Sequence, residues 1–80
     1  MNPEIRKLIA EHARLAVDVG TLADEASLYE AGMTSHATVN LMLALEASFD
    51  VEFPDSMLKR SVFESVTTIT TALAELQPQV

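Results

Sequence analysis

The sequence contains no cysteine and no tryptophan among its 80 residues. Without cysteine, the chain can form no disulfide, no cysteine-based metal site and no thiol nucleophile of its own. Any thiol chemistry must therefore come from an added group. One tyrosine and three phenylalanines leave a core built mainly from Leu, Val, Ile and Met, which suits a small helical domain.

Long apolar runs are also missing. No stretch approaches the roughly 18 apolar residues that a membrane-spanning helix needs. The N-terminal Met-Asn-Pro-Glu lacks the pattern of a signal peptide. We expect a cytoplasmic, monomeric protein that forms one domain over residues 1–80 and has no membrane partner.

Basic residues are few and unevenly placed. The net charge is −7, and residues 15–58 contain eight acids but no Lys or Arg. This distribution would repel nucleic acid and attract a basic protein partner. The alternative is that the acids only keep a small domain soluble.

The pattern of apolar residues predicts an all-α fold. The first helix should begin near Pro3, with Asn2 as its cap, and end near Val17. The long connection over residues 18–34 should be pinned to the core by Leu22 and Leu28, and residues 23–31 could form a helical turn. Loops of this length in small domains are usually functional or partly structured.

The second half of the chain should contain two further helices and one short turn. A helix is expected over residues 35–49, stopped by the Phe53-Pro54 step. Residues 55–60 can form a short turn. Ser65 is a good cap for a last helix over residues 66–76, followed by a frayed tail. The threonines of that segment favour a strand, but its apolar residues repeat at helical spacing. We give the spacing more weight and predict a helix.

The helix over residues 35–49 has two apolar faces. A core stripe would face the interior, and it comprises Thr38, Leu41, Met42, Leu45 and Phe49. A second stripe, made of His36, Val39 and Leu43, lies well away from it. A helix in a small bundle needs only one buried face. The second stripe is therefore either covered by the last helix or the long loop, or it is a docking surface.

The segment from Gly32 to His36 opens this helix with a serine at its N-terminus. Unpaired N–H groups and a partial positive charge at that end would favour an anion attached to Ser35. The plain alternative is that Ser35 or Thr34 is only a helix cap. The segment continues with Leu45-Glu46, Phe49 and Phe53-Pro54-Asp55.

Together these motifs resemble the acyl carrier protein family, with its Gly-x-Asp-Ser-Leu signature, a helix containing Leu-Glu, and an apolar-Pro-Asp step. The resemblance covers residues 22–73 and implies a small four-helix bundle with a long first loop and a short third helix. It further implies that Ser35 carries a covalent 4'-phosphopantetheine, on whose thiol the cargo travels as a thioester. The implied partners are a phosphopantetheinyl transferase, a loading enzyme and a downstream acceptor enzyme.

The sequence departs from ordinary fatty-acid carriers around the serine. Their acids two and five residues after the serine are replaced by Ala37 and Asn40, so acidic charge is missing from the side of the helix expected to be exposed. Partner recognition should instead use neutral contacts from Met33, Thr34, His36, Val39, Asn40 and Leu43. The run resembles the aminoacyl carrier proteins, which are loaded by ligases related to class II aminoacyl-tRNA synthetases. A fatty-acid or polyketide carrier is the alternative.

Other classes of function have weaker support. His36 follows Ser35 directly, but adjacent helical residues do not face each other, and no third residue of a triad is evident. His12 fits the edge of the core better than a catalytic base. Asp50, Glu52 and Asp55 lack the spacing of a calcium loop. The sequence therefore predicts no enzyme and no metal site, and an unmodified helical interaction module remains as the remote alternative.

Overall fold

The computed structural model describes residues 2–77, so the predicted tail lies mostly outside the described residues. Within that range the chain forms three α-helices, α1 (Asn2–His12), α2 (Ser35–Phe49) and α3 (Val66–Leu76). Three short 3-10 helices, η1 (Val19–Thr21), η2 (Asp55–Met57) and η3 (Arg60–Phe63), lie between them. The described residues contain no strand, which confirms the all-α prediction.

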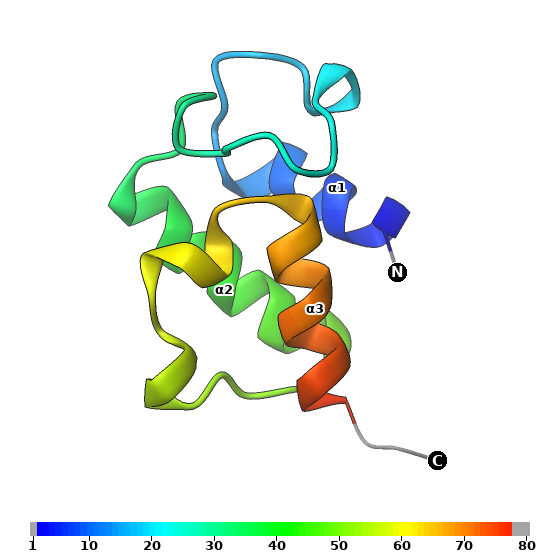
Figure 1. The fold of residues 1–80 in the computed structure, drawn as a ribbon, viewed down its shortest axis with the longest axis vertical. Coiled ribbons are helices and arrows are strands. Elements are labelled where there is room, and N and C mark those ends of the chain that lie inside the picture. The colour runs from blue at the N-terminus through cyan, green and yellow to red at the C-terminus, as the bar shows by residue number, and fades with distance from the viewer. Residues whose placement is uncertain (1, 78–80) are drawn as a thin grey trace.

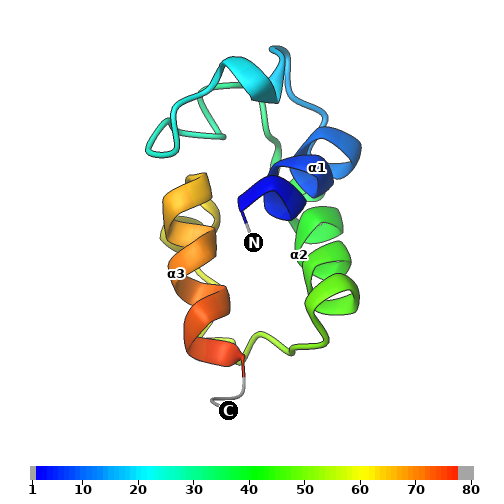
Figure 2. The ribbon, with the colours of Figure 1, turned by 90° about the vertical axis from the view of Figure 1, so that its right-hand side faces the viewer.

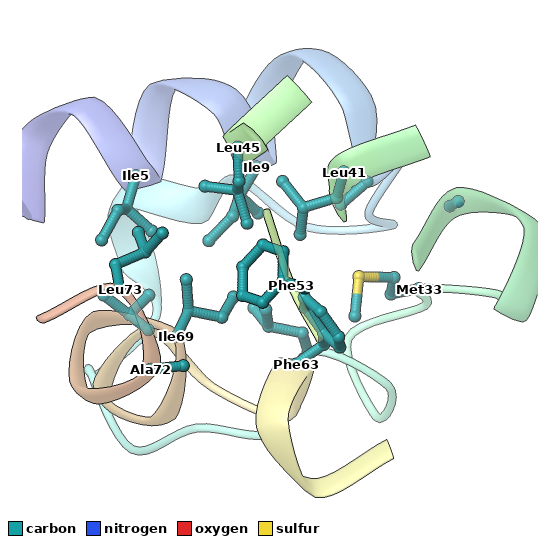
Figure 3. Close-up of a cluster of buried hydrophobic side chains, with 14 residues drawn as sticks. Ile5, Ile9, Met33, Leu41, Leu45, Phe53, Phe63, Ile69, Ala72 and Leu73 are labelled. Atoms are coloured by element: carbon teal, nitrogen blue, oxygen red, sulfur yellow. The ribbon is translucent and has the colours of Figure 1, made fainter. Parts of the chain in front are cut away.

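The helices enclose a core to which each contributes one face. Helix α1 packs against both α2 and α3, and the loop after α1 arches over one end of the molecule (Figure 1). Helices α2 and α3 stand on opposite sides of the core (Figure 2). The largest fully buried side chains come from all three helices and the loop (Figure 3): Ile5, Ile9, Leu28, Leu41, Leu45, Val66, Ile69 and Leu73.

Helices α2 and α3 have the predicted bounds, and local signals explain both. At α3, the hydroxyl of Ser65 accepts a hydrogen bond from the backbone N–H of Thr68, while the Thr68 hydroxyl accepts one from the N–H of Ser65. This capping box satisfies two donors at the helix start. At the end of α2, Asp50 adopts a left-handed conformation, and the Glu46 carboxylate accepts a hydrogen bond of 2.8 Å from the backbone N–H of Phe53. The Glu46 side chain thus fixes the turn that brings Phe53 into the core.

The first helix is shorter than predicted. It ends at His12, because the chain turns away at Arg14, which has a left-handed φ of 52°. Nothing in the sequence marks this turn, since glycine usually occupies such positions. Leu15 still packs against the core, but from the loop, so its helical spacing was misleading. Asn2 is a helical residue and not the predicted cap, and its side chain contacts Arg6 and Asp24.

The predicted four-helix count is not confirmed. The place of the short third helix is taken by η2 and η3, which are 3-10 helices on either side of Leu58 and Lys59. Residues 23–31 form turns, in which the N–H of Ala31 donates a hydrogen bond of 3.2 Å to the Ser27 carbonyl, in agreement with the predicted helical turn. Each of these segments is held by one or two anchors in the core, such as Phe63 and Leu28, and not by a continuous helical face.

The long loop after α1 is fastened at both of its sides. Arg6 of α1 donates hydrogen bonds to the carbonyl oxygens of Val19 and Leu22, at 2.7 and 2.9 Å, and pairs with the Asp24 carboxylate at 2.6 Å. On the other side, the backbone N–H of Leu28 donates to the Glu64 carbonyl at 2.7 Å. Leu28 is fully buried, as predicted, and Leu22 is partly buried. The loop is therefore a structured segment tied to α1 on one side and to the residues just before α3 on the other.

Candidate functional site

Thr34 is the cap of α2, and Ser35 is the first residue of the helix. The Thr34 hydroxyl accepts a hydrogen bond of 3.1 Å from the backbone N–H of Ala37. Ser35 is exposed, and its hydroxyl makes no hydrogen bond with any other described residue. The cap of α2 is therefore Thr34 and not Ser35, and the exposed hydroxyl of Ser35 is not used for capping.

Gly32 determines the path of the backbone just before Ser35. Its φ is +115°, a region that residues with a side chain rarely adopt. A Cβ atom at this position would lie 3.0 Å from the backbone nitrogen of Ala16, which itself donates a hydrogen bond of 2.9 Å to the Ala31 carbonyl. The glycine therefore allows two segments of the long loop to pass closely just before α2 begins.

A groove of about 390 Å³ opens beside Ser35. One wall comes from α2, with Ser35, Val39 and Met42, and the other from the segment that joins η2 to η3. Lys59 of that segment and Arg60, the first residue of η3, line the groove together with Tyr29 of the long loop. No local pattern marks these three residues. Lys59 and Arg60 lie 24 and 25 residues after Ser35, and only folding brings them to one groove with Tyr29 and Ser35.

The second stripe of α2 is exposed, which rules out its coverage by α3 or the loop. Val39 is 51% exposed and Leu43 is 54% exposed. His36 and Thr34 are exposed as well, and Asn40 is partly buried. Leu58, at 47% exposed, adds a further apolar side chain near this face, from the segment after η2. The core stripe is confirmed by Leu41 and Leu45, which are fully buried.

Two expectations about the surface were wrong. Met33 was predicted to contact partners, but it is only 4% exposed and belongs to the core, because the chain turns inward just before the helix. Position 37 was expected on the exposed side of α2, but Ala37 is 2% exposed. An acidic side chain at position 37 would be costly in this packing. The absence of acid there therefore follows from burial, whereas Asn40 does leave the neighbouring surface neutral.

The remaining polar candidates do not assemble into a catalytic or metal site. His36 is exposed, and His12 is partly buried at the end of α1, which agrees with the predicted core edge. No hydrogen bond links Ser35 to either histidine in the part of the chain that is described. Across residues 2–77, no group of three or more His, Asp or Glu side chains is arranged to hold a metal ion. None of the helices described is long and apolar enough to cross a membrane.

One acid of the long loop after α1, Asp24, is paired with Arg6 of α1. The hydrogen bond from Arg6 and, next, one from Asn2 hold the pKa of the Asp24 carboxyl below its usual value of 3.8. One of the eight acids in residues 15–58 is therefore paired, although that stretch contains no base of its own.

Comparison with known proteins agrees with this geometry. Residues 3–75 match the family described as the phosphopantetheine attachment site, and the chain therefore belongs to that family. Within it, the chain is similar to an aminoacyl carrier protein of Agrobacterium fabrum, with 49% identity over 69 residues that cover 86% of this chain and 83% of the relative. It is also similar to aminoacyl carrier protein 1 of Bradyrhizobium diazoefficiens, with 41% identity over 90% of this chain and 78% of the relative.

The fold matches carrier proteins seen in complex with a ligase. One match is to the crystal structure of an engineered Bradyrhizobium japonicum glycine:carrier protein ligase complexed with carrier protein from Agrobacterium tumefaciens and AMP. Its TM-score is 0.90 and its identity 46%, over 92% of this chain and 99% of the matched chain. A second match is to the crystal structure of the B. japonicum glycine:carrier protein ligase complexed with glycylated carrier protein. Its TM-score is 0.76 and its identity 32%, over 89% of this chain and 95% of the matched chain.

Proposed function

We propose that this chain is an aminoacyl carrier protein that holds an amino acid as a thioester on a 4'-phosphopantetheine arm attached to Ser35. The observation that supports the proposal is that the helix cap and the exposed hydroxyl at the start of α2 belong to two different residues. Thr34 caps the helix, and the neighbouring Ser35 has an exposed hydroxyl without a hydrogen-bond partner among the described residues. A hydroxyl that is not needed for capping can be modified without removing the cap.

The position also suits the product of that modification. A phosphodiester on Ser35 would sit at the N-terminus of a helix of 15 residues, where unpaired N–H groups and the helix dipole favour negative charge. The arm itself supplies the thiol that the chain lacks, because the sequence contains no cysteine. The protein residues therefore present and orient the arm, while the thioester chemistry belongs to the added group.

The aminoacyl cargo is supported over a fatty-acid cargo by relatives and by surface chemistry. The relatives above are named aminoacyl carrier proteins, and carrier proteins of the same fold are bound to a glycine:carrier protein ligase. The exposed part of α2 near Ser35 presents Val39, Leu43 and Asn40, which are apolar or neutral. An amino acid:carrier protein ligase would accordingly load the arm after a phosphopantetheinyl transferase has attached it, and an acceptor enzyme would take the cargo.

Mass spectrometry of two single variants tests the attachment site. The apo protein is incubated with coenzyme A and a phosphopantetheinyl transferase. We expect the wild type and Thr34→Ala to gain the mass of the arm, and Ser35→Ala to gain nothing. Thr34→Ala should lose about 1 kcal/mol of stability as a cap variant, while Ser35→Ala should lose little. Modification of Ser35→Ala would contradict the assignment.

A further inference from the structure

The exposed face of α2 carries almost no charge of its own. The helix contains no Lys or Arg, and the carboxylate of its one acid, Glu46, accepts the hydrogen bond from the Phe53 N–H. The exposed apolar side chains Val39 and Leu43 therefore lie on a nearly neutral surface. Any charge that a partner meets at this face must come from the residues on either side of the helix.

The two sides of this face differ in charge. Beside Ser35, the groove is lined by Lys59 and Arg60, and by no Asp or Glu among residues 2–77. Towards α1, a second groove along α2 is lined by Arg14 together with Glu11, so that its positive and negative charges balance. Uncompensated positive charge is therefore confined to the side of α2 that faces η3, on a molecule with a net charge of −7.

The Arg60 side chain is held in place by Tyr29. Its guanidinium carbon lies 3.9 Å from the centre of the Tyr29 ring, which is the geometry of a cation–π contact. The Tyr29 hydroxyl also donates a hydrogen bond of 3.2 Å to the Arg60 carbonyl oxygen. Asp55 begins η2 four residues before Lys59, but neither base forms an ion pair among the described residues. The pair is thus positioned in advance and has no internal carboxylate to neutralise it, so binding an external one costs less side-chain entropy.

We propose that Lys59 and Arg60 bind carboxylates on the enzyme that loads the arm, while Val39 and Leu43 bind an apolar patch of the same enzyme. This inference rests on the proposed function and adds to it the chemistry of the partner's surface. The partner is acidic at this contact, although the net charge of the carrier by itself favours a basic one.

Local charge outweighs net charge at this contact. The screening length at physiological salt is about 8 Å, so an enzyme seated on α2 responds mainly to the groups that it touches. A phosphodiester on Ser35 would add one negative charge, and the two bases would still leave this side of α2 positive. Arg60 can hold a carboxylate through two parallel hydrogen bonds, which also fixes its orientation. The same bases repel a basic enzyme surface and so discriminate against enzymes that recognise acidic carriers.

The two bases should act on association with the enzyme and not on the chemical step. Both are exposed, and complementary charges at the edge of an interface mainly change the rate of encounter and its dependence on salt. The thioester forms at the far end of the arm. Neutralising Lys59 and Arg60 should therefore raise KM for the carrier and leave kcat nearly unchanged.

The first test is the kinetics of aminoacylation of the arm-bearing protein, with the Bradyrhizobium japonicum glycine:carrier protein ligase as the first enzyme. We expect Lys59→Gln/Arg60→Gln to lower kcat/KM about fivefold at low salt, as the loss of two exposed ion pairs predicts, and less than about twofold at high salt. The matched control Lys7→Gln/Arg14→Gln removes two exposed bases that do not line the groove beside Ser35, and it should change kcat/KM less than about twofold.

Carbodiimide cross-linking of the carrier to the ligase gives a second readout. The reagent activates a carboxylate, and a lysine amine displaces the activated group to form an amide, with the reagent leaving as a urea. The chain has two lysines, Lys7 and Lys59. Peptide mapping should find Lys59 joined to an Asp or Glu of the ligase, and Lys7 joined to none. Lys59→Arg keeps the charge and removes the amine, so it should lose the cross-link and keep its rate of loading.

An unchanged or raised kcat/KM in Lys59→Gln/Arg60→Gln would overturn the acidic contact, because the net charge would then govern recognition. Cross-links found only between carrier carboxylates and ligase lysines would do the same. An equal fall in the rate of arm attachment by the transferase would also overturn it, since the bases would then act on the surroundings of Ser35 and not on the loading enzyme. Absence of the arm on Ser35, or of loading of the wild type by any amino acid ligase, would instead overturn the proposed function.

Discussion

Gly32 shows how a single residue can control the geometry of the site from outside it. The residue lies three positions before Ser35, and its positive φ and its missing side chain let the chain pass Ala16 before entering α2. The glycine in the motif is thus explained by a close backbone approach and not by flexibility. A residue with a Cβ would have to displace the Ala16 backbone or change φ.

Gly32→Ala should therefore destabilise the fold by about 1–3 kcal/mol, because it combines an unfavourable φ with a contact of 3.0 Å to a backbone atom. Urea denaturation followed by circular dichroism would measure this. Gly20→Ala is the matched control, since Gly20 has no positive φ and a new Cβ would meet mainly the Asp18 side chain. Equal stability of the two variants would show that the loop adapts around Ala16.

Asp24 links the stability of the long loop to pH. Its pKa is lowered in the folded protein from 3.8 by the hydrogen bonds from Arg6 and Asn2, so the folded state binds the proton less readily than the unfolded chain does. The contribution of Asp24 is therefore complete above about pH 4 and is lost as the pH falls through the lowered pKa.

Asp24→Asn should accordingly lower the melting temperature near pH 7, and the difference from the wild type should shrink below about pH 4. Thermal unfolding between pH 7 and pH 3 measures this. Glu52→Gln is at an exposed position whose side chain makes no hydrogen bond or ion pair with residues 2–77, and it should show a much smaller difference. A constant difference for Asp24→Asn across the whole range would mean that the loop does not depend on the Asp24 charge.

At the scale of the element, one face of α2 packs in the core and the other face is exposed to partners. Leu41 and Leu45 are fully buried against α1 and the core, while Val39 and Leu43 remain about half exposed. Exposed apolar residues that are neighbours on a helix are unusual enough to suggest an interaction surface. Their position beside the Ser35 end of α2 is consistent with enzymes that must reach the arm.

Val39→Ala and Leu43→Ala should each slow aminoacyl loading of the arm-bearing protein by about fivefold or more, because truncated interface anchors commonly cost about 1 kcal/mol or more. Stability should change by no more than about 0.5 kcal/mol, since both side chains are exposed. The measurement is thioester formation by an amino acid:carrier protein ligase. Val17→Ala is the control, at 47% exposed but outside α2.

If Val17→Ala slowed loading as much as Val39→Ala, the stripe would not be the docking surface. Malonyl transfer by a fatty-acid transacylase gives a second comparison with the same proteins. Efficient malonyl loading without loading by any amino acid ligase would leave the carrier function standing and remove the aminoacyl cargo. Asn40→Asp should not improve aminoacyl loading, because recognition is expected to depend on the apolar stripe and not on acidic charge on α2.

The whole molecule carries a net charge of −7, and its acids are concentrated between residues 15 and 58. Arg6 pairs with one of these acids, Asp24, and Lys59 and Arg60 border the groove near Ser35. The other seven acids of this stretch form no ion pair among the described residues. Their mutual repulsion should oppose the compact state at low ionic strength.

Raising sodium chloride from low to moderate concentration should therefore raise the melting temperature, since the screening length falls to about 10 Å at 0.1 M salt. The double variant Glu52→Gln/Asp55→Asn removes two exposed acids and should respond less to salt. A wild-type melting temperature that is independent of salt would show that the acids are too far apart to matter.

The sequence alone predicted the features that depend on local rules. Periodicity and capping residues gave the bounds of α2 and α3, and Leu28 was recognised as an anchor of the loop. The resemblance around Ser35 gave the family, which the comparisons confirm. These predictions succeeded because helix caps, helical spacing and a short motif each involve residues that are close in the chain.

Features that depend on contacts between distant segments have no such local signal in the sequence. The left-handed turn at Arg14 and the 3-10 helices η1 and η3 were missed, and the burial of Met33 and Ala37 was misjudged, whereas η2 falls within the predicted short turn of residues 55–60. The meeting of Tyr29, Arg60 and Ser35 at one groove was not foreseen either. Each depends on how the loop and the segment after α2 pack against the same end of the core. Packing of this kind is set by shape and burial across the whole chain, which no local pattern encodes.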